Sequence, residues 1–92
     1  MKKLIQDNYD SIVKRGLITP NTTKQDFIDK ICEEVNEFWS EVIERNDSGI
    51  KEELADIILT CLNFAKHYNI DIEKELKNKI QVKDFIFTRA LH

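Results

Sequence analysis

Residues that break helices are scarce in this chain. Its 92 residues include two glycines and one proline, whereas 34% of the residues are charged. Glycine and proline are the strongest local interrupters of helical structure, and here they fall where one apolar repeat stops and the next begins. A chain with so few breakers predicts an all-α fold.

Capping residues divide the sequence into four expected helices. Gly16 is placed as a C-cap after the first apolar repeat. Thr23, followed three residues later by Asp26, predicts the capped start of a long second helix. The stretch NDSG at 46–49 should end that helix, and Asp71 can cap the last one. The expected helices are 3–15, 24–45, 50–67 and 72–83.

Residues 1–92 are expected to form a single domain. Its tail at 84–92, DFIFTRALH, stays open among the end of a helix, a short strand and an arm that docks on a partner. A chain of this length buries only about 60 to 65% of its unfolded surface. The core should therefore be small, and partner copies of the chain are expected.

Charge and hydropathy argue against two classes of partner. The 17 acidic and 14 basic residues give a net charge of −3, which provides no field for holding a polyanion such as duplex DNA. No window approaches the 18 apolar residues that a membrane span needs. We expect a cytoplasmic protein that binds neither nucleic acid nor membrane. Cys32 and Cys61 are expected to be packed, reduced thiols.

Two acidic pairs stand beside the apolar faces of the second and third helices. At about 100° per residue, Glu34 lies at the edge of the apolar arc of the second helix, and Glu37 is its neighbour one turn on. Glu53 and Asp56 have the same offsets from the arc of the third helix. Because the short connection makes the two helices antiparallel neighbours, the four carboxylates are expected to share one groove. Four other glutamates are interpreted as solvated: Glu33, Glu41, Glu44 and Glu52.

A groove of four carboxylates is unfavourable when it is empty, because like charges one turn apart repel. Oxygen ligands without His or Cys select a hard cation, and Mg²⁺ held by carboxylates usually also contacts water and substrate phosphates. The pattern therefore favours phosphate chemistry. The alternative is a glutamate-rich helix face that is simply solvated.

At these residues the chain resembles the MazG-like all-α nucleoside triphosphate pyrophosphohydrolase superfamily. The motif EExxE, a gap and ExxD are present as E33-E34-V-N-E37 and E53-L-A-D56, and the resemblance extends over about residues 26–83. It implies a four-helix MazG-like bundle completed by oligomerisation, as a homodimer or homotetramer. It also implies a Mg²⁺ cofactor, with Mn²⁺ as an alternative, and a nucleoside triphosphate substrate that is split into monophosphate and pyrophosphate.

The resemblance also implies roles for individual residues. Glu33 matches the first glutamate of the motif, which orients or deprotonates a water. Lys30 and Lys79 fall where the family has basic residues near the phosphates, and Lys83 is a further candidate of that kind. The residues that match the metal ligands are Glu34, Glu37, Glu53 and Asp56.

Two alternative functions remain beside the pyrophosphohydrolase. One is phosphoribosyl-ATP pyrophosphohydrolase, which belongs to the same superfamily and has the same carboxylate pattern. The other is a noncatalytic helical module that dimerises through its apolar faces. Farther along the third helix, Asn63 is a candidate for reaching a substrate, whereas His67 is expected to be a surface residue.

Overall fold

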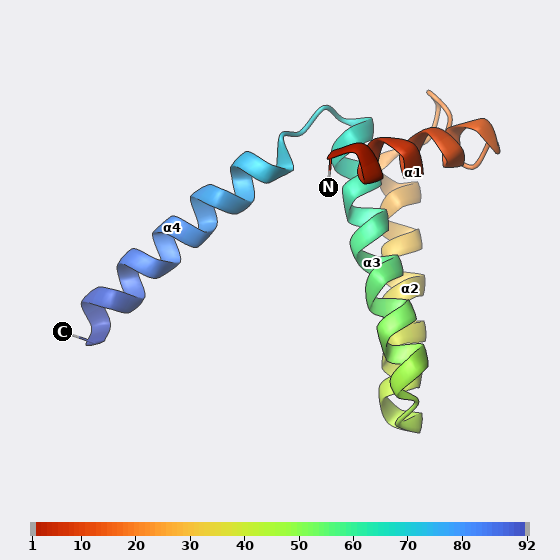
Figure 1. Cartoon of the computed structure of the whole chain (residues 1–92). Coiled ribbons are helices and arrows are strands. Elements are labelled where there is room, and N and C mark those ends of the chain that lie inside the picture. Colours follow the sequence, from red (N-terminus) through yellow and green to blue (C-terminus); the bar gives the residue numbers. More distant parts are fainter. Residues whose placement is uncertain (1, 92) are drawn as a thin grey trace.

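The computed structural model describes the backbone of residues 2–91 and the side chains of residues 2–81. It contains four α-helices in the order expected, joined by short connections (Figure 1). All the secondary structure in the described residues is helical, so the all-α class is confirmed. The helices are α1 (Lys2–Lys14), α2 (Lys24–Glu44), α3 (Asp47–His67) and α4 (Ile72–Leu91).

The predicted caps determine most of the helix ends. Gly16 follows α1 with a φ of 74°, in the left-handed region that glycine adopts without strain. Thr23 and Asp26 form a capping box at the start of α2. The Asp71 side chain accepts a hydrogen bond from the Lys74 amide at 3.1 Å, which caps α4.

The connection between α2 and α3 is shorter than expected. Only Arg45 and Asn46 separate the two helices, so the prediction that α3 begins at Ile50 is wrong by one turn. The reason is the Asn46 side chain, which accepts a hydrogen bond from the Gly49 amide at 3.3 Å and so caps a turn that begins at Asp47. A cap of this kind satisfies one of the free amides of a helix N-terminus.

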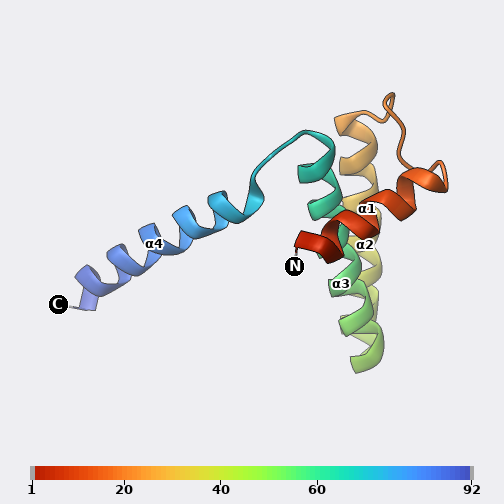
Figure 2. The same ribbon diagram turned by 45° about the horizontal axis from the view of Figure 1, so that its top comes forward.

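Helices α2 and α3 lie side by side as an antiparallel hairpin, and α1 crosses them near the C-terminal end of α3 (Figures 1 and 2). Aromatic side chains fill this junction. Phe27 is 4% exposed, and its ring packs edge-on against Phe64 at a centroid distance of 5.4 Å. His67 and Tyr68 also pack on the Phe27 ring. The main core of the chain therefore lies at one end of the hairpin.

Polar contacts hold α1 against α3. The Asn8 side-chain amide donates to Asn63 Oδ1 at 2.9 Å, and the Tyr9 hydroxyl lies 3.0 Å from His67 Nδ1. The expectation that His67 is a surface residue is therefore wrong, because its ring packs among Tyr9, Phe27 and Tyr68.

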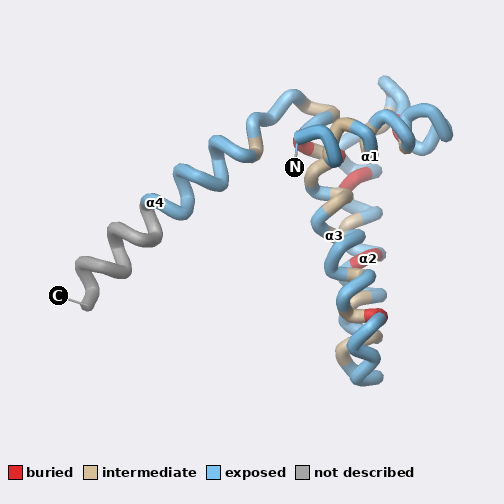
Figure 3. Tube along the Cα trace, in the orientation of Figure 1, coloured by how far each residue is buried: buried red, intermediate tan, exposed pale blue. Residues whose placement is uncertain are grey.

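In the hairpin, α2 and α3 bury only part of each other's apolar arc. Exposed residues run along most of both helices (Figure 3), and Trp39 is 62% exposed. Cys32 and Cys61 are free thiols, as expected, but both are exposed rather than packed. Two helices cannot cover arcs as wide as these. The large apolar residues left exposed on the hairpin are Ile28, Val35, Trp39, Ile43, Leu54 and Ile58.

Helix α4 extends away from the other three helices (Figure 1). The tail left open by the sequence belongs to this helix, which continues to Leu91 instead of ending at Lys83. The apolar side chains of Leu76 and Ile80 are more than half exposed. Among the residues described, none of the helices is both long and apolar enough to cross a membrane.

Candidate carboxylate site

The acidic pairs of α2 and α3 occupy adjoining turns of the hairpin. Glu34 is the most buried of the four carboxylates at 5% exposure, and one of its oxygens accepts a hydrogen bond from the Thr60 hydroxyl of α3. Glu53 is half-buried, whereas Glu37 and Asp56 are exposed. The sequence did not identify Thr60, although it follows Asp56 by one turn and therefore lies on the same flank of α3.

The environment of Glu34 raises the pKa of its carboxyl above the ordinary value. Burial is the largest cause, because desolvation disfavours the charged form. The Thr60 hydrogen bond and the charge of Lys30 act in the opposite direction, while Asp56 and Glu37 raise the pKa further. The charges of carboxylates on both helices therefore act on Glu34.

The pKa of Glu53 is also raised. Burial is again the first cause, and the neighbouring carboxylates of Glu37, Asp56 and Glu41 raise it further. Glu53 Oε2 is buried and has no hydrogen-bond partner among the residues described. The site is therefore a group of mutually repelling carboxylates, and it has oxygen atoms that are free to bind a cation.

Glu41 joins this group, so its interpretation as a solvated glutamate is wrong. It is half-buried, its Oε2 is buried without a hydrogen-bond partner in the described part of the chain, and its charge acts on Glu53. A Cβ atom at Gly49 would meet the Glu41 carboxylate, so the glycine leaves room for this side chain. The signal in the sequence was the position of Glu41, four residues after Glu37 on one helix face.

The other predicted site residues lie farther out. Glu33 is exposed and forms an ion pair with Lys30 at 3.6 Å. The charge of Lys30 also lowers the pKa of Glu34. Lys30 therefore interacts with both the first glutamate of the motif and the buried one. Lys79 is exposed on α4, which extends away from α2 and α3 (Figure 1). The side chain of Lys83 lies outside the described residues.

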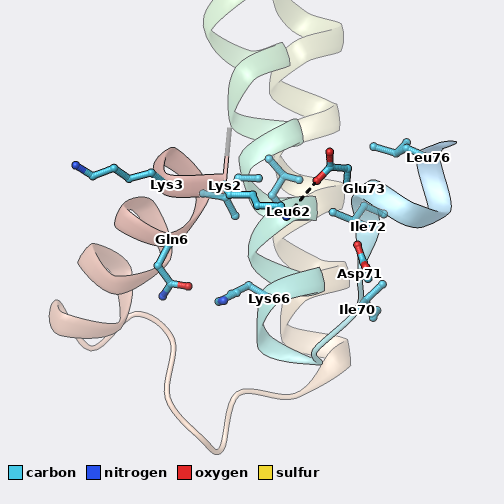
Figure 4. Close-up of a pocket in the computed structure, with 11 residues that line it drawn as sticks. Lys2, Lys3, Gln6, Leu62, Lys66, Ile70, Asp71, Ile72, Glu73 and Leu76 are labelled. Atoms are coloured by element: carbon cyan, nitrogen blue, oxygen red, sulfur yellow. Dashed lines mark ion pairs between the residues drawn. The ribbon is translucent and has the colours of Figure 1, made fainter.

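Two cavities adjoin the hairpin. One, of about 390 Å³, lies beside Glu34 and is lined by residues that include Lys30 and Thr60. The other, of about 560 Å³, lies between α1, the end of α3 and the start of α4 (Figure 4). Lys2 and Glu73 face each other across it at 3.9 Å. None of the four carboxylates of the motif lines the larger cavity.

The fold and the site define an all-α domain with an acidic centre between two antiparallel helices. A family model for the MazG nucleotide pyrophosphohydrolase domain matches residues 22–84. The chain therefore belongs to this family of hydrolases, and the resemblance seen in the sequence is confirmed. Searches of curated proteins and of solved structures gave no significant match.

The resemblance implies a divalent metal, and the carboxylates suit such an ion in several respects. The donors are all oxygen, as hard cations prefer. Among the residues described, two buried carboxylate oxygens lack partners, and burial, with the neighbouring carboxylates, raises the pKa of both Glu34 and Glu53. Within the described residues, no three acidic, His or Cys side chains are grouped as a set of metal ligands. The carboxylate oxygens are thus of the kind that a divalent cation prefers, but their side chains are spread apart in this structure.

Proposed function

We propose that this chain is a Mg²⁺-dependent nucleoside triphosphate pyrophosphohydrolase that converts an NTP or dNTP and water into the monophosphate and pyrophosphate. One observation carries the proposal. Glu53 has a buried carboxylate oxygen without a partner among the residues described, and burial together with the neighbouring carboxylates of α2 and α3 raises its pKa. A divalent cation would relieve this repulsion, and membership of the MazG family supports a nucleotide as the substrate.

Each residue of the motif has a role in the proposal. Glu34, Glu37, Glu53 and Asp56 would hold Mg²⁺, or Mn²⁺ in its place. The bound ion would neutralise the triphosphate and make a water easier to deprotonate. Thr60 would orient Glu34 through its hydrogen bond. Glu33 would position the attacking water or take its proton, and Lys30 would stabilise charge on the phosphates.

We further propose that the chain acts as a homodimer or homotetramer, with 1–92 as one domain. Apolar side chains more than 40% exposed on α2, α3 and α4 support this, because contiguous exposed apolar surface typically marks an interface. Lys79 and Lys83 on α4 would then reach the carboxylates of a neighbouring copy. The free thiols support a reducing, cytoplasmic location.

The mass in solution is expected to be at least twice the 10.9 kDa of one chain. Replacing Trp39 and Ile58 together by Asp would place charges on the exposed apolar surface and shift the mass toward one chain, as measured by light scattering. Leu4→Asp, at an exposed position on α1, is the matched control and should leave the mass unchanged. A wild-type protein of 10.9 kDa would contradict the oligomer.

The metal-free protein is expected to lose stability as the pH rises. The pKa values of Glu34 and Glu53 are raised above 4.5, so the folded state binds more protons than the unfolded state. The free energy of unfolding therefore falls as pH rises from about 4.5 through the folded pKa values. Mg²⁺ should offset this loss, and so raise Tm more at about pH 7.5 than at about pH 5.

Thermal unfolding in EDTA and in MgCl₂ measures both effects. Glu53→Gln removes one of the two groups and should flatten the decline of Tm with pH. Asp26, whose pKa is lowered by its bonds to Thr23, contributes in the opposite direction, equally in both proteins. A Glu53→Gln variant with the wild-type pH profile would contradict the expected linkage.

Pyrophosphate release from a panel of NTPs and dNTPs with Mg²⁺ tests the proposed activity. Phosphoribosyl-ATP belongs in the same panel, because the runner-up enzyme of the superfamily acts on it. Release that depends on the carboxylates supports the proposal. A protein that binds Mg²⁺ and forms oligomers but releases no pyrophosphate from any of these substrates would instead be the noncatalytic module.

A further inference from the structure

The larger cavity, of about 560 Å³, lies at the base of α4 (Figure 4). Its volume and its mainly apolar walls are typical of a small-molecule site. Among the described residues that line it none is aromatic, so it offers an aliphatic chain a fitting surface and a planar base no ring to stack on. We call it the aliphatic cavity, after its apolar wall residues Ile5, Leu62, Ile70, Ile72 and Leu76.

A second cavity, of about 390 Å³, adjoins the aliphatic cavity. The two share Lys2, Asp71 and Glu73 as lining residues, so the Lys2–Glu73 ion pair lies where they meet. The other residues of this second cavity, the polar cavity, all lie on α4. They are Lys74, Lys77, Asn78 and Gln81.

The two cavities carry a charge opposite to that of the chain. Five lysines and two carboxylates line them, whereas the whole chain has a net charge of −3. Both carboxylates already have partners. Glu73 pairs with Lys2 and, at 3.5 Å, with Lys77, and Asp71 accepts a hydrogen bond from the Lys74 amide. An anion bound here would therefore meet a net positive charge.

Three of the five lysines are left for such an anion. Lys3, Lys66 and Lys74 form no ion pair within the described part of the chain. Lysine lays its apolar stem along an apolar surface and keeps its ammonium in water. The Lys66 side chain extends in this way from α3 toward Gln6 of α1 (Figure 4). Aliphatic walls with a cationic rim complement a ligand that has an apolar chain and an anionic head.

We propose that the two cavities form one site for an amphipathic anion, with an aliphatic chain in the aliphatic cavity and a carboxylate or phosphate head on the lysines. None of the four motif carboxylates lines either cavity, so this inference does not depend on the proposed hydrolase. A bound ligand would contact α1, α3 and α4 at once, adding to the Lys2–Glu73 contact between α1 and α4. Binding should raise Tm, because the ligand binds the folded chain.

Calorimetric titration of the wild-type chain in EDTA with butyl, hexyl and octyl phosphate tests the aliphatic cavity. Burial of each added CH₂ should tighten binding about two- to fourfold. Inorganic phosphate and 1-octanol each supply one part of the ligand, so each should bind at least about tenfold more weakly than octyl phosphate. Octanoate, titrated in parallel, identifies the preferred head group.

Three results of these titrations would overturn the proposal. One is the failure of both octyl phosphate and octanoate to bind. Another is an affinity that does not depend on chain length, since the chain would then lie outside the cavity. The third is equal affinity for octyl phosphate and 1-octanol, since the lysines would then play no part.

Leu76→Glu places a carboxylate in the wall of the aliphatic cavity, at a position that is 53% exposed. It should weaken octyl phosphate binding at least about tenfold, because it removes apolar wall and repels the head group. The matched control is Ile80→Glu, one turn farther along α4, 56% exposed and outside the lining of both cavities. This control should bind as the wild type does. Equal affinities of the two variants would overturn the proposal.

The double variant Lys66→Gln, Lys74→Gln tests the head group. Its preference for octyl phosphate over 1-octanol should be at least about threefold smaller than that of the wild type. The matched control, Lys51→Gln with Lys79→Gln, removes one charge from each of the same helices outside both cavities and should keep the preference. An unchanged preference in the Lys66, Lys74 variant would overturn the role of the lysines.

Methyl resonances distinguish the ligand from a second copy of the chain as the occupant. Octyl phosphate should shift the signals of Ile5, Leu62 and Ile72 in the wild type. Shifts that occur only after the Trp39 and Ile58 substitutions to Asp have separated the copies would mean that a partner chain covers the cavity. That result would overturn the proposal.

A last variant separates this inference from the proposed function. Octyl phosphate should bind the Glu37→Gln, Asp56→Asn variant as tightly as the wild type. A loss of about tenfold or more would place the ligand at the motif carboxylates and overturn the proposal. If octyl phosphate binds but the wild type releases no pyrophosphate from any nucleotide, the hydrolase alone is refuted.

Discussion

The double variant Glu37→Gln, Asp56→Asn is expected to release pyrophosphate from nucleoside triphosphates at least about a hundredfold more slowly than the wild type. One carboxylate is lost from each helix of the hairpin. Both act on Glu34 and Glu53, so the variant removes half of the proposed ligand set without touching the buried members. Amides keep the shape of the side chains and a neutral oxygen, but they hold Mg²⁺ far less strongly than carboxylates do.

Stability separates this effect from unfolding. Removing two like charges relieves repulsion in the cluster, so Tm in EDTA should stay level or rise, while the gain in Tm from Mg²⁺ should shrink. The matched control is Glu44→Gln, Glu52→Gln, which removes two charges from exposed positions of the same helices. That control should keep wild-type activity. Wild-type rates in the Glu37, Asp56 variant would remove the basis for the proposed metal site.

Phe27→Ala should cost about 3 to 5 kcal/mol of unfolding free energy. The ring is 4% exposed and packs against Phe64, His67 and Tyr68, so its loss leaves a hole in the aromatic junction. For a domain of this size the fall in Tm should be about 12 °C or more.

Phe27→Leu, which keeps much of the volume, should cost clearly less than Phe27→Ala. Leu4→Ala, at an exposed position, should change stability by less than about 0.5 kcal/mol. Chemical denaturation of the three variants measures the differences. Similar losses for Phe27→Ala and Leu4→Ala would mean that the aromatic junction is not the core of the chain.

Local signals in the sequence predicted the helices and most of their ends. Gly16, the capping box of Thr23 and Asp26, and Asp71 each act within a few residues, so they can be recognised without knowing the fold. The start of α3 was missed because Asn46 was interpreted as part of a stop signal, although its side chain also caps the following helix.

The site was predicted less completely than the fold. Periodicity predicts on which face of a helix a residue lies, but it does not predict how deeply the neighbouring helix buries that residue. The offsets of Glu34 and Glu53 were recognised, but the burial of Glu34 under Thr60 depends on how α3 is seated. The same limit explains Glu41, which the sequence assigned to solvent. Cys32 and Cys61 are exposed for a related reason, since two helices cover only part of the apolar arcs.

The two-residue link of Arg45 and Asn46 has a consequence for how this domain can vary. One inserted residue there would slide α3 by about 1.5 Å and turn it by about 100° relative to α2, which would carry Glu53 and Asp56 away from Glu34 and Glu37. The closed end of the hairpin thus tolerates no change in length. The opposite end, where 15–23 joins α1 to α2, is free to lengthen or change composition, so diversity among chains of this design should accumulate around the cavity beside Glu34 and spare the acidic centre.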